Sequence, residues 1–483
     1  MTGLAVVFYT NVRPFEPRER DYAVVGSFYF FALWLGIGVF ALYDYLKKYV
    51  APKPVAVGVV LLSLLAAPVL MASQNWDDHD RSQKYSALNN AKAYLYSCQK
   101  NAIIYTIGDN DTFPLWYARD VEGIRTDMRI INTSLLNTDW YIDQAKRKVY
   151  EAAPMKIKIP HKKYVYGTRD ALYPNFIKDT LDIKDFLKLA LNDKFTTVNE
   201  ENGQTIYLYP SRYIRVPVNK ENVLKYGIVS PKDSTKILDE IILDVGEDGI
   251  YKNSLAMLDQ LANSDWKRPI YFSGGSFGDS DYLFAKNYLQ LDGLAYKLVP
   301  IYTPYQGIDY GRIDTDTMYA HVKKWDWGNL NKGIYLDPET RRNSLSFRNV
   351  LFRLADSLFV ENKKQKAEEI LDLSIDKMPV EQFGFYTSLL DYIDLYYQLG
   401  KRDKARRLAN TLTKRFKEYL DYYADMSLSE KYRNFDDIER NFLLYREVLN
   451  IAAKNNDNQY VEDKMKGFES IMTKYQDMLE EGN

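Results

Sequence analysis

The sequence contains almost no cysteine and very few histidines. Cys98 is the one cysteine, which excludes an intramolecular disulfide and any zinc site built from cysteines. The three histidines, His79, His161 and His321, lie far apart and show no helical ligand spacing, which disfavours a histidine metal centre. We therefore interpret Cys98 as a small core residue and predict no metal site of either type.

The chain also has almost no net charge. The 64 lysines and arginines balance 65 aspartates and glutamates, so no overall attraction to nucleic acid exists and no nucleic-acid partner is predicted. Aromatic residues are abundant, with 41 tyrosines and 7 tryptophans. Their apolar rings with polar edges suit a membrane interface or a carbohydrate or peptide contact surface, and core packing is the alternative. The length of 483 residues predicts two or three structural units.

Two uncharged stretches near the N-terminus predict transmembrane helices. Residues 22–43 contain no charged side chain over 22 residues, which at 1.5 Å per residue crosses a hydrocarbon layer of about 30 Å. Residues 55–72 form a second uncharged stretch, with Pro68 near its end, where a kink is tolerated. A buried helical hairpin of a soluble domain is the alternative. We predict a membrane segment over residues 1–74.

The side of the membrane follows less directly from the basic residues. Three lysines lie between the spans and three arginines precede the first, so the counts are equal. Arg18 and Arg20 alternate with Glu19 and Asp21, which indicates a paired cluster rather than a cytoplasmic anchor. We therefore place the lysine loop in the cytoplasm and the soluble portion in the periplasm, outside the inner membrane. The apolar residues 1–10 resemble the end of a helix that begins upstream.

After residue 75 the pattern is typical of an α/β domain, which we place at residues 75–340. The predicted strands, rich in β-branched residues, are 102–107, 128–133, 240–245 and 269–273. The predicted helices between them are 84–98, 113–122, 140–151 and 250–263. This alternation favours a parallel or mixed sheet. Residues 205–209 and 212–216, around Pro210 and Ser211, predict a hairpin inserted near residues 154–218.

The remaining residues, 341–483, have the pattern of an all-helical segment. Residues 354–379 and 392–416 each show a helix, a short polar turn and a second helix that starts near an alanine, Ala367 or Ala405. This arrangement resembles tetratricopeptide repeats, with two or three units that pack on the α/β domain. A generic antiparallel helical bundle is the alternative.

Two polar clusters flank the predicted spans. Arg18 and Arg20 precede the first span, and guanidinium groups suit the phosphate of a lipid head group or a lipid-linked sugar. A solvated salt-bridge network is the alternative. Asp77, Asp78 and His79 follow the second span and would suit a hard cation or acid–base chemistry. Capping of the next helix by Asp80 or Ser82 is the alternative there.

A third polar cluster, residues 108–117, follows the first predicted strand. Capping by Asp111 or Thr112 of a helix that starts at about residue 113 explains part of it and leaves Asp109 and Asn110 unexplained. Residues 137–140 and 273–276 follow two other strands, and loops after parallel strands meet at one edge of a sheet. A shared pocket would offer hydrogen-bond acceptors and an aromatic stacking face from Trp116, Tyr117 or Trp140. Ordinary capped turns are the alternative.

Four stretches together resemble a known family, the bacterial membrane proteins of glycosyltransferase family 117 (domain of unknown function family 2723), which are protein O-mannosyltransferase-like. They are PRERDYAVVGSFY (17–29), NWDDHDRS (75–82), GDNDTFPLWYARDVEGIRTD (108–127) and SLLNTDWYIDQ (134–144). The resemblance implies an integral membrane enzyme with a lipid-linked sugar donor and an extracytoplasmic part with tetratricopeptide-like repeats. The chain departs from the family because the many N-terminal spans of the transferase domain, with their acidic catalytic loop, are absent.

We therefore expect the C-terminal membrane and periplasmic portion of a glycosyltransferase-like protein, which contributes substrate binding without the full catalytic centre. Catalytic residues are not assigned. The expected partners are a membrane lipid or lipid-linked sugar, a protein or glycan acceptor and a separately encoded N-terminal transferase half. The acidic clusters would also suit a divalent cation. The predicted substrate-binding residues are Arg18, Arg20, Asp77, Asp78, His79, Asp109, Asn110, Asp111, Trp116, Asn137, Asp139 and Trp140.

Two other functions remain open from the residues alone. A membrane-tethered scaffold would bind peptides or proteins through its tetratricopeptide-like helices and would perform no chemistry. An aspartate-dependent metal hydrolase would rest on the acidic clusters alone.

Overall fold

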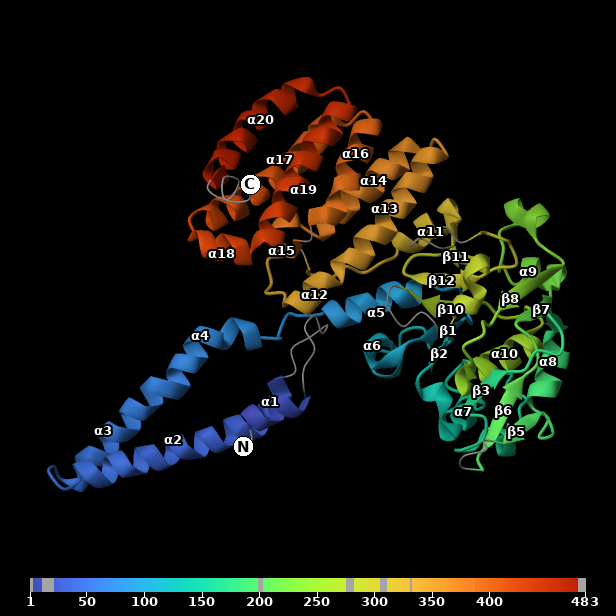
Figure 1. The fold of residues 1–483 in the computed structure, drawn as a ribbon, viewed down its shortest axis with the longest axis horizontal. Helices are drawn as coiled ribbons and strands as arrows, with labels where there is room; N and C mark the ends of the chain where they lie inside the picture. The colour runs from blue at the N-terminus through green and yellow to red at the C-terminus, as the bar shows by residue number, and fades with distance from the viewer. Residues whose placement is uncertain are drawn as a thin grey trace. The chain divides into compact units, whose positions relative to one another are not determined.

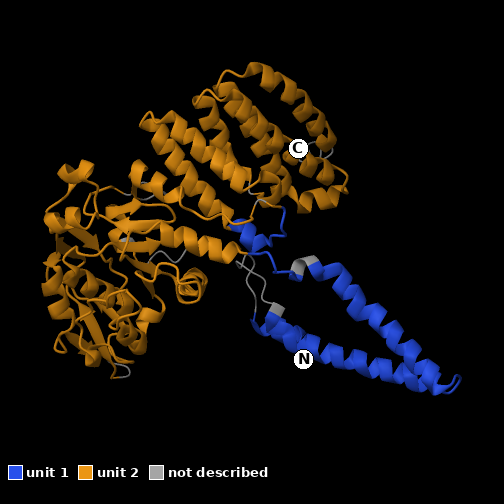
Figure 2. Cartoon of the chain, turned by 180° about the vertical axis from the view of Figure 1, so that it is seen from behind, with its two compact units in different colours: residues 1–84, 333–342 blue, residues 85–332, 343–483 orange. Residues whose placement is uncertain are grey.

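A computed structural model describes residues 3–10, 21–198, 203–274, 282–304, 311–330, 332–384 and 386–476. The chain forms two compact units (Figure 2). The first comprises residues 1–84 and 333–342, and the second comprises residues 85–332 and 343–483.

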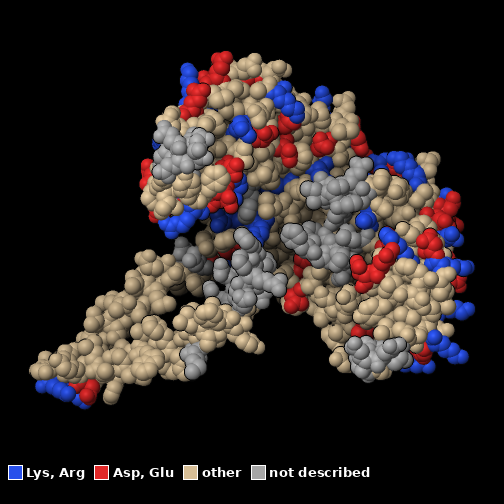
Figure 3. All heavy atoms as spheres, viewed as in Figure 1, with Lys and Arg blue, Asp and Glu red and all other residues tan. Residues whose placement is uncertain are grey.

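The first unit contains two helices long and apolar enough to cross a membrane. They cover Tyr22–Leu46 and Pro52–Trp76, 25 residues each, and almost none of their residues is buried. On the face shown in Figure 3, the described side chains of this helical hairpin that carry a charge lie near its tip. Its elements are α1 (Leu4–Thr10), η1 (Asp21–Val24), α2 (Val25–Leu46), α3 (Pro52–Leu64), η2 (Leu65–Val69), α4 (Leu70–His79) and α12 (Pro338–Arg342).

Pro68 changes the geometry of the second apolar helix without ending it. Proline lacks the backbone N–H and its ring crowds the carbonyl of the preceding turn. The helix accommodates this with a π-helical turn, η2, between α3 and α4. Since the helix continues to His79, the polar residues 75–79 form its last turn.

The second unit contains a six-stranded mixed sheet with the order β13-β11-β12-β10-β1-β2 (Figure 1). Three neighbouring strands are parallel, with β1 between β10 and β2. β12 runs antiparallel to both β10 and β11. The strands are β1 (Ile103–Thr106), β2 (Arg129–Asn132), β10 (Ile270–Ser273), β11 (Leu289–Leu291), β12 (Ala295–Leu298) and β13 (Arg312–Ile313).

Helices cover both faces of this sheet because its buried strands alternate their side chains. Ile104 and Ile130 pack with α5 (Ser86–Tyr96) and α6 (Gly108–Asp120). Ile103 and Ile131 point the other way and pack with α7 (Asp139–Ala145) and α10 (Lys252–Ser264). Strands with two buried faces read as continuous apolar runs, which is why the sequence located them.

The predicted hairpin at residues 205–216 is wrong. Both strands form, but β6 (Thr205–Tyr209) pairs with β3 and β5, whereas β7 (Tyr213–Pro217) pairs with β4 and β8. Residues 171–182 run parallel to both, so the chain continues in one direction through Pro210 instead of reversing. Proline followed by serine lacks the positive φ angles of a tight hairpin turn.

The predicted strand at 240–245 also forms, as β8, but in this second group of strands and not in the central sheet. The two small sheets have the orders β5-β6-β3-β9 and β4-β7-β8. Their remaining strands are β3 (Ala171–Pro174), β4 (Thr180–Asp182), β5 (Thr196–Val198), β8 (Glu240–Asp244) and β9 (Ile250–Tyr251). The short helices of this region are η3 (Leu135–Asn137), η4 (His161–Lys163), α8 (Ile183–Ala190), α9 (Lys220–Lys225), η5 (Pro231–Lys236), η7 (Leu283–Tyr288) and α11 (Thr315–Val322).

The C-terminal region is helical, as predicted. In its described part, three helical hairpins follow one another: α13 (Ser344–Val360) with α14 (Lys364–Lys377), α16 (Leu390–Gln398) with α17 (Arg402–Ala424), and α19 (Phe435–Lys454) with α20 (Asn458–Met472). The connecting elements are α15 (Val380–Phe383), η8 (Tyr386–Leu389), α18 (Leu428–Arg433) and η9 (Thr473–Tyr475).

The three hairpins share one turn geometry. Asn362, Gly400 and Asn456 have φ angles of 61°, 75° and 58°, the left-handed region that asparagine and glycine tolerate best. In each turn the next residue donates its backbone N–H to the carbonyl five residues earlier. The first hairpin contacts the α/β region, because Lys363 pairs with Asp316 of α11 at 2.8 Å.

Candidate functional site

Three loops leave the central sheet at the same edge. β1, β2 and β10 are parallel and in register, with Thr106 opposite Asn132 and Tyr105 opposite Phe272. Their carboxyl ends are therefore adjacent, as the order of elements predicted. The loop after β10 is described only as far as Gly274, so residues 275 and 276 lie outside the described part of the chain.

The loop after β1 is shorter than predicted because α6 begins at Gly108. Gly108 has a φ angle of +66°, which lets the strand turn directly into the helix. The predicted cap at Asp111 or Thr112 is therefore wrong, and no side chain caps this helix. Thr112 is buried instead, and its hydroxyl lies 2.6 Å from the Thr106 hydroxyl and 2.9 Å from Asn132 Nδ2. This network fixes the strand ends relative to the helix.

The acidic residues of this loop occupy the first turn of α6. Asp109 and Asn110 are exposed and form no hydrogen bond with any described residue. Asp111 is partly buried, and its Oδ2 accepts a hydrogen bond of 3.3 Å from Ser273 Oγ at the end of β10. Asp111 therefore connects two loops of the edge, while Asp109 and Asn110 remain open to a ligand.

The loop after β2 leads into α7. Asn137 Oδ1 accepts the backbone N–H of Asn253, the second residue of α10, at 3.0 Å. Asp139 accepts the backbone N–H groups of Tyr166 at 3.2 Å and Trp140 at 2.7 Å. These hydrogen bonds lower the pKa of Asp139 below its ordinary value, so its carboxylate is ionised at neutral pH.

The predicted aromatic residues differ in accessibility. Trp116 packs against both core clusters and stacks on Phe113 with ring centroids 5.5 Å apart. Trp140 is 55% exposed and meets Tyr141 edge to face. Tyr117 is exposed, and its hydroxyl donates to Glu122 at 2.6 Å. Trp140 therefore offers the open stacking face beside Asp139, whereas Trp116 mainly contributes to packing.

The sequence did not reveal a chain of hydrogen bonds one turn beyond Asp139. Nδ1 of His161 lies 2.9 Å from Asp143 Oδ2, and the Tyr164 hydroxyl donates to Asp143 Oδ1 at 2.6 Å. Lys146 Nζ donates in turn to the Tyr164 hydroxyl at 2.7 Å. His161 has a side chain 56% exposed. Asp143 orients the imidazole so that Nε2 faces away, available for a hydrogen bond or proton transfer.

Two side chains in this chain of hydrogen bonds, Tyr164 and Lys146, have pKa values that differ from their ordinary values. Burial and the neighbouring Asp143 carboxylate raise the pKa of Tyr164. Burial lowers the pKa of Lys146. Tyr164 therefore stays protonated. Its hydroxyl accepts a hydrogen bond from Lys146 and donates one to Asp143, so it links the two side chains. Sequence patterns could not pair His161 with Asp143, because the contact depends on the path of the chain between α7 and η4.

The clusters near the two long apolar helices are only partly described. Arg18 and Arg20 lie outside the described residues, as do the side chains of Asp77 and Asp78. His79 is exposed in the last turn of α4. Its Nδ1 lies 2.9 Å from the carbonyl oxygen of Asn75, one turn earlier in the same helix.

The predicted capping by Asp80 or Ser82 is also wrong. Asp80 Oδ1 accepts the backbone N–H of Ser82 at 2.8 Å within the turn after α4. The next helix, α5, starts only at Ser86 and has no side-chain cap. Among the described residues, no group of three or more histidine, cysteine, aspartate or glutamate side chains is arranged to hold a metal ion.

Comparison with protein families shows a match for the α/β region. Residues 87–317 match the family model described as TMEM260-associated domain 2. This segment contains all three sheets and every loop of the edge described above. Neither the curated proteins nor the solved structures contain a match to the chain.

Proposed function

We propose that this chain is the C-terminal membrane and periplasmic portion of a glycosyltransferase-like, protein O-mannosyltransferase-related membrane protein. It binds a sugar substrate without supplying the full catalytic centre. The family resemblance of the four stretches supports this proposal, together with two helices long enough to cross a membrane. The match to TMEM260-associated domain 2 covers the soluble region that carries two of these stretches.

The observation that carries the proposal is the gathering of polar and aromatic side chains at one edge of the sheet. Asp109 and Asn110 are exposed and unpaired among the described residues, and Asp139 is an ionised acceptor one turn from the Asp143–His161 pair. Carboxylates and amides accept hydrogen bonds from sugar hydroxyls, and the exposed Trp140 ring can stack on a sugar face.

A binding experiment tests this site in the full chain in detergent. The probes are polyprenyl-phosphate mannose and polyprenyl-phosphate glucose, and the readout is the equilibrium dissociation constant. Trp140→Ala should weaken binding about two- to thirteenfold, because an aromatic face contributes about 0.5–1.5 kcal/mol. The matched control is Tyr422→Ala, which removes another exposed aromatic residue, on α17. Equal affinities for wild type, Trp140→Ala and Asp139→Asn would refute the proposed site.

The membrane-proximal arginines have a separate role in this proposal. Arg18 and Arg20 bind the phosphate of the lipid-linked donor at the membrane surface, and a guanidinium can contact two phosphate oxygens at once. Arg18→Lys should therefore impair binding of the same probes nearly as much as Arg18→Ala. Full binding by Arg18→Lys would instead indicate a simple surface charge.

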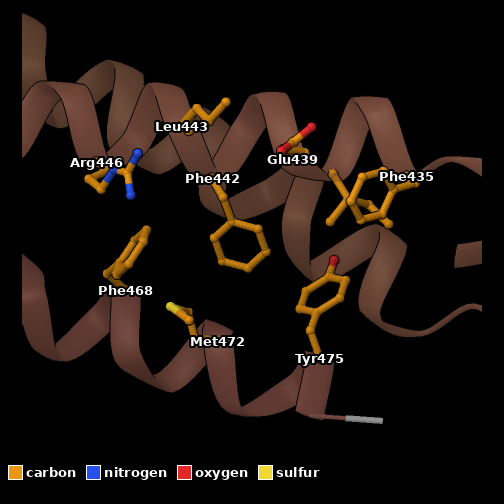
Figure 4. Close-up of a pocket in the computed structure, with 9 residues that line it drawn as sticks. Phe435, Glu439, Phe442, Leu443, Arg446, Phe468, Met472 and Tyr475 are labelled. Atoms are coloured by element: carbon orange, nitrogen blue, oxygen red, sulfur yellow. The ribbon is translucent and has the colours of Figure 1, made fainter. Parts of the chain in front are cut away.

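A second candidate function is a membrane-tethered scaffold, in which the helical hairpins act as tetratricopeptide-like protein-binding units. An apolar groove between α19 and α20, of about 280 Å³, favours it (Figure 4). Phe442 of α19 and Phe468 of α20 point toward one another in that view, and their rings meet edge to face with centroids 5.7 Å apart. Its other apolar lining residues are Phe435, Ile438, Leu443, Met472 and Tyr475.

The partner that fits this groove is a second copy of the chain. Glu439 and Arg446 lie on the groove and form no ion pair with any described residue. They flank Phe442 and Leu443 on α19. If two α19 helices pack antiparallel about an axis between Phe442 and Leu443, Glu439 of each copy faces Arg446 of the other.

Substitutions that exchange the charges of Glu439 and Arg446 distinguish pairing between two copies of the chain from binding of an unrelated protein. The mass of the full chain in detergent is measured by light scattering. Glu439→Arg and Arg446→Glu should each produce monomers, whereas the double variant should restore the dimer. Glu462→Arg, on the exposed part of α20, is the matched control. A monomeric wild type, or a double variant that stays monomeric, would refute pairing between copies.

A further inference from the structure

Two arginines lie at the start of the two strands that flank β1, β2 and β10. Arg129 is the first residue of β2, and Arg268 lies two residues before β10. β1 runs between them, because Ile103 donates its N–H to the Pro269 carbonyl and Arg129 donates its N–H to the Ala102 carbonyl. Both arginines therefore lie at the amino-terminal edge of the parallel strands, opposite the edge that carries the proposed sugar site.

Within the described part of the chain, both side chains donate hydrogen bonds only to backbone carbonyl groups. Arg129 donates from Nη2 to the last two carbonyls of α7, at 3.0 and 3.1 Å. Arg268 donates to the carbonyl oxygens of Asn101 at 2.5 Å and Ala153 at 2.9 Å. No described carboxylate forms an ion pair with either arginine. Two positive charges thus share this edge without a negative partner.

The nearby carboxylates are already engaged. Asp120 accepts two hydrogen bonds from Arg119. Asp127 accepts two from Arg125 and one from the backbone N–H of Asn101. Asp127 is close enough to favour the charged form of Arg268, but neither carboxylate forms an ion pair with Arg129 or Arg268.

Several hydrogen-bond donors at this edge have no partner among the described residues. Arg129 is 3% exposed, yet no described residue accepts a hydrogen bond from its buried Nε and Nη1 atoms. The Nη2 atom of Arg268 and the hydroxyl of Tyr105 are buried and unpaired in the same way. Tyr105 lies on β1, between the two arginine-bearing strands. Buried donors without acceptors are costly, and a positive charge without a counterion is costlier still.

A small pocket opens beside the edge strand β2. Its volume is about 40 Å³, and its lining includes Arg129, Arg119, Trp116 and Tyr141. This volume corresponds to a few water molecules or one small inorganic anion. Burial lowers the pKa of Arg129, with a further contribution from Arg119. Burial and the proximity of Arg129 lower the pKa of Arg268 to about 10, so Arg268 remains protonated at neutral pH.

We propose that Arg129, Arg268 and Tyr105 form a binding site for a small inorganic anion, which enters through the pocket beside β2. The anion accepts the unpaired N–H and O–H groups and neutralises the two guanidinium charges. It connects the ends of the three parallel strands to α7 and to residue 153, both of which the arginines already bind. A halide and an oxyanion share this chemistry, and the experiment separates them.

The test is thermal unfolding of the full chain in detergent, followed by intrinsic fluorescence. The protein is exchanged into gluconate, and then chloride, phosphate or sulfate replaces gluconate at constant ionic strength. An anion that binds the folded chain raises the unfolding midpoint with a saturable dependence on its concentration. The anion with the lowest half-saturating concentration identifies the class of ligand.

Two variants assign the effect to this site. Arg129→Met should abolish the saturable shift, and Tyr105→Phe, which removes one donor and little volume, should raise the half-saturating concentration about three- to tenfold. Arg147→Met is the matched control, since Arg147 is exposed on the segment just after α7. No saturable shift with any of the three anions would refute the site and leave water as the occupant. An equal shift in wild type and Tyr105→Phe would also refute it.

Discussion

Removal of the Lys297 ammonium should destabilise the α/β region strongly. Lys297 of β12 pairs with Asp292 at 2.8 Å, and the two side chains are 2% and 0% exposed. Asp292 also accepts hydrogen bonds from the Tyr271 hydroxyl at 3.0 Å and from Gln290 Nε2 at 2.8 Å. Lys297→Met preserves much of the apolar stem but leaves a buried carboxylate that only neutral donors contact.

The magnitude follows from the burial of the pair. Breaking a buried ion pair by removal of one partner costs about 3–5 kcal/mol. Unfolding entropy near 60 °C is about 2.1 cal/mol/K per residue. If the roughly 250 residues of the segment 85–332 unfold together, the midpoint should fall by about 6–10 °C. Thermal unfolding of the full chain in detergent at pH 7 measures this fall.

The pH dependence and a double variant provide controls. Burial opposes ionisation of Asp292, but Lys297 holds its pKa below the ordinary value. Without Lys297 the pKa of Asp292 should rise, so the carboxyl protonates more easily and the deficit of Lys297→Met should shrink as pH falls from 7 towards 4. Asp292→Asn combined with Lys297→Met should cost less than the sum of the two single changes. Additive costs, or a fall below about 2 °C for Lys297→Met, would refute the reasoning.

Three further predictions concern other parts of the chain. Burial lowers the pKa of His321, so stability is present above about pH 6.5 and is lost as pH falls below it; His321→Gln should make the midpoint of thermal unfolding depend less on pH between pH 7 and 5. Gly293→Ala should cost about 1–3 kcal/mol in urea unfolding, because φ is +114° and a Cβ would lie 2.2 Å from Ser97 Oγ. Lys48→Cys should not react with a membrane-impermeant thiol reagent in intact cells, and the buried Cys98 gives little background; reaction would reverse the proposed topology.

The sequence predicted the elements whose burial is complete or whose apolar runs are long. The two N-terminal apolar helices and strands β1, β2 and β10 are close to their predicted positions, because an uninterrupted apolar run has few alternatives to burial. The order of strands and helices along the chain was enough to predict that the loops after β1, β2 and β10 lie at one edge of the sheet. The tetratricopeptide assignment stays a prediction, although the repeated turns at Asn362, Gly400 and Asn456 are consistent with repeated units.

The errors arose where a contact joins distant residues or where a local rule had a competitor. Capping residues suggested a start for α6 near residue 113, but Gly108 supplied a positive φ angle and the helix began there. The apparent hairpin around Pro210 failed because residues 171–182 pair with both strands. His161 seemed isolated in the sequence, since its partner Asp143 is brought near only by the folded loop between them.

The position of β1 between β10 and β2 has a consequence for biosynthesis. β1 pairs with β10, and Ile103 and its partner Ile270 are 167 residues apart in the chain. At about 5–20 residues per second, β10 follows β1 from the ribosome after roughly 8–30 s. During this interval β1 and β2 can pair, but the other edge of β1 exposes unsatisfied backbone groups to any neighbouring strand. Nascent chains should therefore be most prone to aggregation, and most dependent on chaperones, until residue 273 has emerged.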